Sequence, residues 1–258
     1  MSLWTLLIDG DVLAYRVAAA CERPYCWDPG VGDEWSLHSH MEDIREGIDG
    51  SIERIKYDIE HLGFPPGHIE VYLTDSHNFR RELNPEYKSN RRGSRKPVNL
   101  KEARGYLASR YRAEMWDNLE ADDCLGIRAT EPAELGARII CSVDKDFLNI
   151  PEAWTWDPWK DGDKPVFTGR DEAHQHFLAQ VLSGDHVDGY PGIPGVGTKT
   201  ARKHLDKFGY RWQSVVDLYE KKGLTEEDAL MTARMAHILH WGDYDQNSGA
   251  VDLWQAEG

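Results

Sequence analysis

The chain has few of the residues that would mark a secreted or membrane-bound protein. Only four of its 258 residues are cysteines, and they form neither a CxxC pair nor a set with zinc-ligand spacing. Cys124 and Cys141 lie within apolar segments, as buried thiols do, which indicates a reducing cytoplasm. No apolar run approaches membrane-spanning length, and the first residues lack the basic flank of a signal peptide. We therefore expect a cytoplasmic protein that does not enter a membrane.

Positive charge is also scarce. The 30 Lys and Arg residues face 45 Asp and Glu residues, so the net charge is −15. This balance excludes a general nucleic-acid coat protein, which would be basic. The cations are unevenly spread, however, because nine of them and only three acids lie between Arg80 and Arg104. Such a segment is either a polyanion-binding surface or a solvated charged loop.

Short apolar runs and helical patterns alternate along the first part of the chain. Each of three β-branched-rich runs ends in an aspartate: Asp9, Asp75 and Asp144. Helical spacing is found at 44–62, 106–116 and 123–130, while 22–37 has the composition of a surface loop. The hydrophobic content of 40% supports a packed core. Strands alternating with helices predict an α/β fold with a mostly parallel central sheet flanked by helices.

The character of the sequence changes near residue 180. The segment 184–201 is rich in glycine and proline and then becomes helical, and a further helix begins near Thr225, with Asp228 completing a capping box. We therefore predict two units, an α/β domain over 1–180 and a C-terminal helical subdomain over 181–258.

Carboxylates gather where this fold should converge. The three strand-terminal aspartates should share one sheet edge, and further acids lie at helix starts or loop mouths: Glu120, Asp122, Asp123, Asp146, Asp185 and Asp188. Acids near a helix start are often only dipole partners. Two carboxylates 4 Å apart, however, repel by roughly 4 kcal/mol at an effective dielectric of 20. Divalent cations would neutralise such a cluster, and oxygen-only ligands favour Mg²⁺ or Mn²⁺ over Zn²⁺.

The Asp9-Gly10-Asp11 motif allows a second interpretation. A strand ending in Asp-x-Asp also begins the haloacid-dehalogenase-type phosphatases, in which the first Asp is the nucleophile. That family's pattern has Thr two residues after the second Asp, where this chain has Leu13. The other acid clusters have no role in that scheme, so we rank it second.

Several motifs together resemble those of the flap endonuclease superfamily, and within it the stand-alone bacteriophage 5′→3′ exonucleases. They are Asp9-Gly10, Thr74-Asp75, the 84–91 segment NPEYKSNR, the 120–123 segment EADD, the 142–146 segment SVDKD and the glycine-rich 184–201 segment. The similarity runs from about Leu6 to Trp254. It implies a PIN-like nuclease domain and a C-terminal helix–hairpin–helix subdomain.

The resemblance also implies roles for individual residues. Two Mg²⁺ or Mn²⁺ ions would be held by Asp9, Asp75, Asp122 and Asp123 on one side and by Asp144, Asp146, Asp185 and Asp188 on the other, with Glu120 between them. Lys88 and Arg91 would be catalytic and reach the scissile phosphate from an arch over about 80–104. The expected DNA-binding residues are Tyr15, Arg80, Tyr87, Arg92, Arg95, Lys96, Gly195, Gly197, Lys199 and Thr200. Tyr15 would stack on a terminal base, although a core tyrosine on the first helix is the alternative.

The implied activity is hydrolysis of phosphodiester bonds from a 5′ end in duplex DNA, at nicks or flaps, and in RNA primers on DNA. The family often binds a monovalent cation such as K⁺ at the hairpin. The arch segment is short and broken by Gly93 and Pro97, which favours removal of nucleotides from a duplex end over threading of a long flap. We expect a monomer in the host cytoplasm. The alternatives are a PIN-type ribonuclease and a non-catalytic DNA-end-binding accessory protein.

Overall fold

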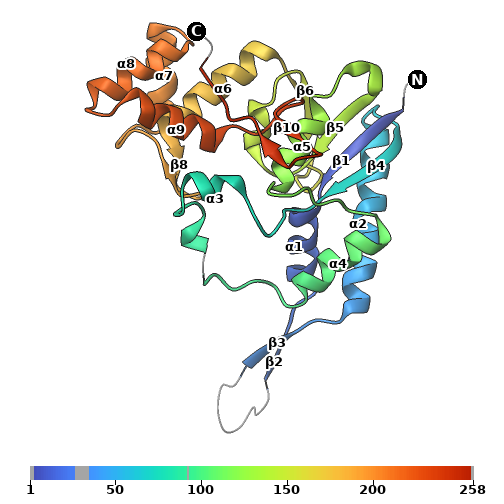
Figure 1. Ribbon diagram of the computed structural model, residues 1–258. Helices are drawn as coiled ribbons and strands as arrows, with labels where there is room; N and C mark the ends of the chain where they lie inside the picture. Colours follow the sequence, from blue (N-terminus) through green and yellow to red (C-terminus); the bar gives the residue numbers. More distant parts are fainter. Residues whose placement is uncertain (1–2, 27–34, 92, 257–258) are drawn as a thin grey trace.

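The computed structural model describes residues 3–26, 35–91 and 93–256. Its main sheet has the strand order β4-β1-β5-β6-β7 (Figure 1). These strands are β1 (Trp4–Asp9), β4 (Pro66–Tyr72), β5 (Ala137–Cys141), β6 (Ala153–Trp156) and β7 (Val166–Thr168). The first four run parallel, and only β7 pairs antiparallel. The predicted α/β class with a mostly parallel central sheet is therefore confirmed.

The central strand β1 shows how the core is divided. Leu6 and Ile8 pack into one hydrophobic cluster and Leu7 into another, because successive side chains of a strand point to opposite faces. All three are fully buried, as expected for an interior strand of a parallel sheet. The first face is covered by α1 (Gly10–Ala20), α2 (Met41–His61) and α4 (Leu100–Arg110), and the second by α5 (Ala121–Ala129).

The helical spacing over 44–62 is confirmed as α2, whose five isoleucines Ile44, Ile48, Ile52, Ile55 and Ile59 are all buried. None of the helices in the described part of the chain is long and apolar enough to cross a bilayer.

The C-terminal part forms a helical unit with its own core. It consists of α6 (Arg170–Ser183), α7 (Thr198–Phe208), α8 (Trp212–Lys221) and α9 (Glu226–Ala236), which share one hydrophobic cluster. Helix α6 begins at Arg170, so the predicted domain boundary between residues 180 and 181 falls inside this helix. The capping box at the start of α9 is present, because Asp228 N donates to Thr225 Oγ1 at 3.2 Å and Thr225 N donates to Asp228 Oδ2 at 2.8 Å.

Short elements complete the fold. They are α3 (Phe79–Leu83), the 3₁₀ turns η1 (Ser89–Arg91), η2 (Ala133–Leu135) and η3 (Lys145–Asn149), and the strand pairs β8 (Gly184–Asp185) with β9 (Tyr190–Pro191) and β10 (Tyr244–Asp245) with β11 (Ala250–Val251). After α9 the chain returns to the sheet domain, where Ile238 and Leu239 pack beside α5.

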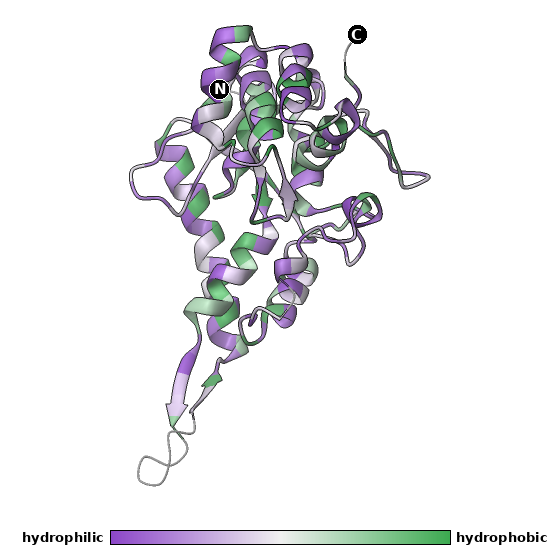
Figure 2. Cartoon of the chain, turned by 90° about the vertical axis from the view of Figure 1, so that its left-hand side faces the viewer, coloured by the Kyte–Doolittle hydropathy of each residue, from purple (hydrophilic) through white to green (hydrophobic). Residues whose placement is uncertain are grey.

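Two local expectations are wrong. The helix expected over 106–116 ends at Arg110, because Glu114 instead pairs with the end of β4: Glu114 N donates to Val71 O at 2.9 Å, and Leu73 N donates to Glu114 O at 2.8 Å. The expected loop at 22–37 contains a hairpin of β2 (Arg23–Cys26) and β3 (Trp35–His38). This hairpin projects away from the rest of the chain (Figures 1 and 2).

Candidate active site

The carboxyl ends of the parallel strands gather acids at one edge of the sheet. Asp9 is the last residue of β1, and α1 begins directly after it at Gly10. A Cβ on Gly10 would lie 2.6 Å from Tyr72 O, so only glycine lets this turn pack against the end of β4. Asp144 follows β5 on the neighbouring strand, and Asp122 lies in the first turn of α5. These acids line one cavity of about 580 Å³ together with Glu120 and Asp188.

Asp9 is buried, with 3% of its surface exposed, and is held in place by two hydrogen bonds. Val12 N donates to its Oδ1 at 3.0 Å and Ser142 Oγ donates to its Oδ2 at 2.9 Å. Burial raises the pKa of Asp9 to about 6, and the nearby Asp11 and Asp144 add to this. The pKa of Asp122 is raised well above its usual range by burial and by the negative charges of Asp9 and Asp144. Negative charge is thus concentrated here beyond what the protein neutralises.

A second group of acids lies at the junction with the helical unit. Asp146 accepts a hydrogen bond from Gln180 Nε2 at 2.8 Å, and burial raises its pKa to about 7, with contributions from Asp144 and Asp185. Asp185 Oδ1 accepts from Val187 N and Asp188 N, which shapes the turn between β8 and β9. Burial also raises the pKa of Asp188.

Glu120 lies between the two groups of acids and contacts Tyr87 and Lys88 of the basic segment. Lys88 Nζ lies 2.7 Å from Glu120 Oε1, and Tyr87 donates its hydroxyl to Glu120 Oε2 at 2.8 Å. Burial alone would raise the pKa of Glu120, but Lys88 and Arg80 hold it below its usual value. Lys88 Nζ also lies 3.5 Å from Asp188 Oδ2, and Arg91 forms an ion pair with the same carboxylate. Together the two groups of acids and Glu120 form what we call the acid edge: Asp9, Glu120, Asp122, Asp144, Asp146, Asp185 and Asp188. Both predicted catalytic cations are therefore at the acid edge.

The backbone fixes Lys88 at that position. Lys88 N donates to Asp188 O at 2.8 Å, so the basic segment is joined to the β8–β9 turn. Gly189 has a φ of +78°, and a Cβ there would lie 3.1 Å from Glu86 O. A side chain at this position would be strained in its backbone and would push the two segments apart.

Arg80 is predicted to bind DNA and Asp123 to bind a metal ion, but in the structure the two side chains pair with each other. Arg80 is 3% exposed and donates from both terminal nitrogens to the Asp123 carboxylate, at 2.6 and 2.8 Å. Arg80 also donates to the backbone oxygens of Met235 and His237, and Asp123 is fully buried. Arg80 therefore cannot meet DNA, and Asp123 serves this buried pair instead of a metal. Tyr87, expected on DNA, is likewise buried, and its hydroxyl contacts Glu120.

Asp75 also departs from the expected arrangement. Its carboxylate accepts hydrogen bonds from Ser76 N and Asn118 N, and it does not line the cavity. Asp11 and Arg104, which are not among the predicted site residues, do line it. Asp11 forms an ion pair with Arg104 and accepts from Thr74 N at 2.9 Å. The Asp-x-Asp pattern of Asp9 and Asp11 is the signal in the sequence that indicates Asp11.

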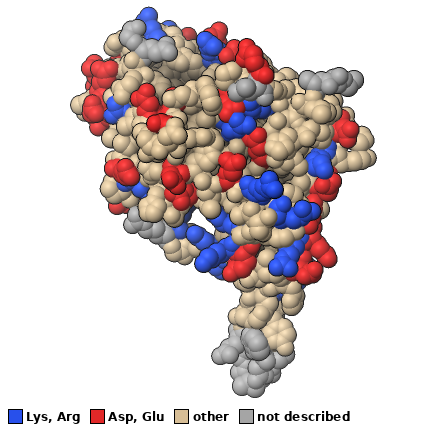
Figure 3. Space-filling model, turned by 45° about the vertical axis from the view of Figure 1, so that its right-hand side comes forward, with Lys and Arg blue, Asp and Glu red and all other residues tan. Residues whose placement is uncertain are grey.

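Cations and one aromatic side chain also line the cavity. Arg91, Lys96 and Arg104 belong to this lining, and so does Tyr15, which is 49% exposed. Tyr15 is therefore not a core residue. Figure 3 shows an opening in the surface bordered by Lys and Arg side chains. Arg95 is exposed but holds the Glu22 carboxylate with two hydrogen bonds. Arg92 lies outside the described residues.

The glycine-rich hairpin lies apart from the cavity. Gly195, Gly197, Lys199 and Thr200 are all exposed around the start of α7. Gly195 has a φ of +77°, as a tight turn there requires. This surface exposes glycine backbone and the Lys199 cation, which suits contact with a phosphate backbone.

The donor set at the acid edge fits divalent hard cations. Its ligand atoms are carboxylate oxygens only, as Mg²⁺ and Mn²⁺ prefer. The raised pKa values of Asp9 and Asp146 mean that a cation would be stabilised at both ends of the edge. The acids are nevertheless spread out. In the described part of the chain, the group of three potential ligand residues whose donor atoms all lie within 4.8 Å of one another is a different one, His237, His240 and Asp243.

The fold is similar to the folds of two solved nucleases. The chain superposes on the T5 5′-exonuclease with a TM-score of 0.63 at 14% identity, covering 91% of this chain and 87% of that one. It also superposes on flap endonuclease-1 from Methanococcus jannaschii with a TM-score of 0.50 at 13% identity, covering 96% and 82%. These are likenesses of fold.

The sequence relatives come from phages and bacteria. The chain is 29% identical to an exodeoxyribonuclease of Enterobacteria phage T3, over 96% of this chain and 92% of the relative. It is 28% identical to an exonuclease of Escherichia phage T7, over 97% and 93%. A flap endonuclease Xni of Shewanella putrefaciens is 29% identical over 79% and 74%. No protein-family model matches the chain.

Proposed function

We propose that this protein is a 5′→3′ exonuclease and flap endonuclease that hydrolyses phosphodiester bonds of duplex DNA, in phage-type replication or recombination. One observation carries the proposal: carboxylates at the end of β1, at the start of α5, after β5 and in the β8–β9 turn line one cavity together with cations of the basic segment. A scissile phosphate needs both, because cations must offset its charge while carboxylates hold the metal.

The residues divide the work as follows. Asp9, Asp122 and Asp144 would hold one Mg²⁺ or Mn²⁺ ion, and Asp146, Asp185 and Asp188 a second. When bound, two such ions activate water and stabilise the leaving oxygen. Lys88 and Arg91 would turn from their carboxylate partners toward the phosphate, where their charge offsets that of the transition state.

The surroundings of the cavity define the substrate that we propose. Tyr15 would stack on the terminal base at a free 5′ end, a nick or a flap. Gly195, Gly197, Lys199 and Thr200 would contact the duplex backbone irrespective of its sequence, with K⁺ at this hairpin. Such contacts also admit an RNA primer on DNA. The protein would act as a monomer in the host cytoplasm.

The test is digestion of a duplex labelled at either the 5′ or the 3′ end, with Mg²⁺ or with EDTA. We expect early release of the 5′ label, dependent on Mg²⁺ and abolished by Asp144→Asn. The matched control is Asp161→Asn, a change in an exposed acid outside the site. Release of the 3′ label first, or full activity in excess EDTA, would refute the proposal.

A further inference from the structure

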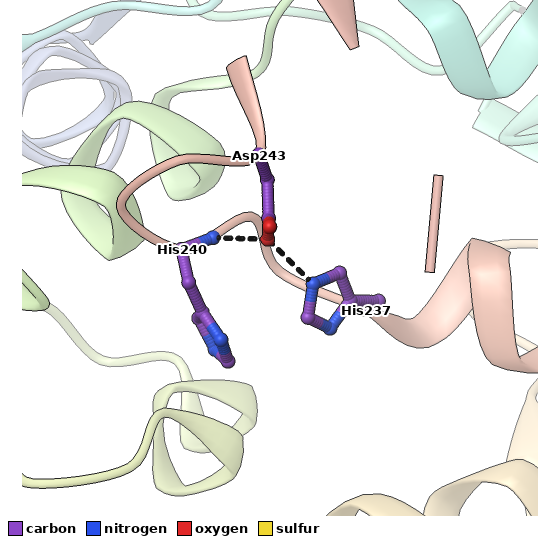
Figure 4. Close-up of side chains that lie close together, drawn as sticks. All are labelled: His237, His240 and Asp243. Atoms are coloured by element: carbon purple, nitrogen blue, oxygen red, sulfur yellow. Dashed lines mark hydrogen bonds and ion pairs between the residues drawn. The ribbon is translucent and has the colours of Figure 1, made fainter. Parts of the chain in front are cut away.

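A second group of potential metal ligands lies in the segment after α9, remote in sequence from the acid edge. His237, His240 and Asp243 each offer one donor atom, and these atoms lie within 4.8 Å of one another. His237 Nε2 is 2.9 Å from Asp243 Oδ2, and the two imidazole rings have centroids 4.7 Å apart. Figure 4 shows the rings on either side of a space beside the carboxylate. We propose that these three side chains bind a divalent transition-metal ion of the Zn²⁺ type.

The chemistry of this group differs from that of the acid edge. Two imidazole nitrogens and one carboxylate oxygen suit Zn²⁺, whereas Mg²⁺ prefers oxygen ligands alone. Ligands of a tetrahedral Zn²⁺ with bonds of about 2.0–2.1 Å lie about 3.3 Å from one another. The present separations are therefore within a small side-chain adjustment of a zinc site.

The backbone holds this group in place before any ion arrives. His240 N donates to Asp243 Oδ2 at 2.8 Å, and Asp243 N donates to His240 O at 3.0 Å, which closes a tight turn. Asp252 N donates to Asp243 O at 2.7 Å. At the other end, His237 O accepts from Arg80 Nη2 at 2.6 Å. A preorganised turn loses little conformational entropy on binding an ion.

The position also leaves room to complete the coordination. His237 and Asp243 side chains are 11% and 29% exposed, and all three residues line a cavity of about 840 Å³. Three protein ligands with a fourth position open to water is a common zinc arrangement. Arg80 donates to the backbone oxygen of His237 at the start of this turn. A bound ion would therefore stabilise the segment after α9, in which the chain passes from the helical unit back to the sheet domain.

The experiment measures Zn²⁺ binding to the full chain after removal of metals with EDTA and dialysis. Equilibrium dialysis would use equimolar Zn²⁺ in excess Mg²⁺, which occupies the acid edge. We expect one Zn²⁺ per chain and a higher Tm. His240→Ala and Asp243→Asn should each weaken Zn²⁺ binding by at least about 10–100-fold, whereas His68→Ala, at an exposed strand position, should not. Circular dichroism would verify that each variant is folded.

A second measurement needs no variant. X-ray absorption of the zinc-loaded wild-type protein should show two imidazole ligands, whereas zinc at the acid edge would show oxygen alone. Oxygen-only coordination, or wild-type affinity in both ligand variants, would overturn the proposal. Mg²⁺-dependent cleavage by the same samples reports on the acid edge separately, so loss of zinc with retained cleavage leaves the nuclease assignment intact.

Discussion

Two neighbouring aspartates at the start of α5 should respond in opposite ways to the same change. Asp122 faces the cavity beside Asp9 and Asp144, and its pKa is raised well above the usual range. Asp123 is fully buried and pairs with Arg80 at 2.6 and 2.8 Å. Replacing each by Asn keeps the shape and removes one charge. The pair therefore separates a functional carboxylate from a structural one.

The magnitudes follow from the partners. Asp123→Asn breaks the buried ion pair of Arg80 and leaves only the more distant Glu120, 3.7 Å away, as a carboxylate partner. Breaking a buried pair costs about 3–5 kcal/mol of folding stability. For a chain of this size that corresponds to a Tm lowered by roughly 6–20 °C. Asp122→Asn removes a charge that the fold disfavours, so in metal-free buffer the stability should be unchanged or higher.

Activity should show the reverse order. We expect Asp122→Asn to lower Mg²⁺-dependent cleavage at least roughly 100-fold. Asp123→Asn, assayed well below its Tm, should cleave at a rate close to that of the wild type. The assay is a thermal melt in EDTA followed by cleavage of a 5′-labelled duplex. If Asp123→Asn abolished cleavage in a folded protein of normal stability, Asp123 would be a metal ligand and not the structural partner of Arg80.

Three further predictions concern the basic segment, the acid edge and the hairpin. Lys88→Ala should lower turnover by about 10²–10³-fold with DNA binding within a few-fold of wild type, because the charge acts on the transition state; quench-flow cleavage and binding in Ca²⁺ test this. The raised pKa of Asp146, about 7, means that the folded protein binds this proton more tightly than the unfolded chain. Its stabilising contribution is therefore full below about pH 4 and lost as the pH rises through 7. Metal-free Asp146→Asn should consequently exceed wild type in Tm at pH 7.5 but not at pH 4, and added Mg²⁺ should offset the loss in wild type. Lys199→Ala should reduce the slope of log binding against log salt by about one unit on any duplex sequence, with Lys221→Ala as the control.

The sequence predicts the fold well where periodicity is strong. The apolar runs before Asp9 and Asp144 became β1 and β5 because interior parallel strands are continuously hydrophobic. In the same way, the isoleucines at helical spacing predict the buried face of α2. The helix predicted over 106–116 is wrong because Glu114 pairs with the end of β4, and this pairing overrides the local helical preference.

The site was less predictable for a related reason. Asp122 and Asp123 are adjacent and chemically alike, and only the direction of each side chain around the first turn of α5 separates cavity from core. Arg80 lies in the basic segment and is predicted to bind DNA, yet its partner Asp123 is 43 residues away in sequence. Such pairings depend on tertiary structure, which spacing along the chain does not report. The metal assignments themselves remain predictions.

The central claim is that the acid edge carries the chemistry of cleavage. The most direct measurement compares wild type with Asp144→Asn in two assays: cleavage of a 5′-labelled duplex across Mg²⁺ concentrations, and DNA binding in Ca²⁺. Asp144 accepts from Asp146 N and is exposed, so the substitution should leave the fold intact. We predict crippled cleavage at every Mg²⁺ concentration, with DNA binding unchanged or tighter, since a negative charge facing phosphate is removed. Weakened binding with full turnover at saturation would contradict the account.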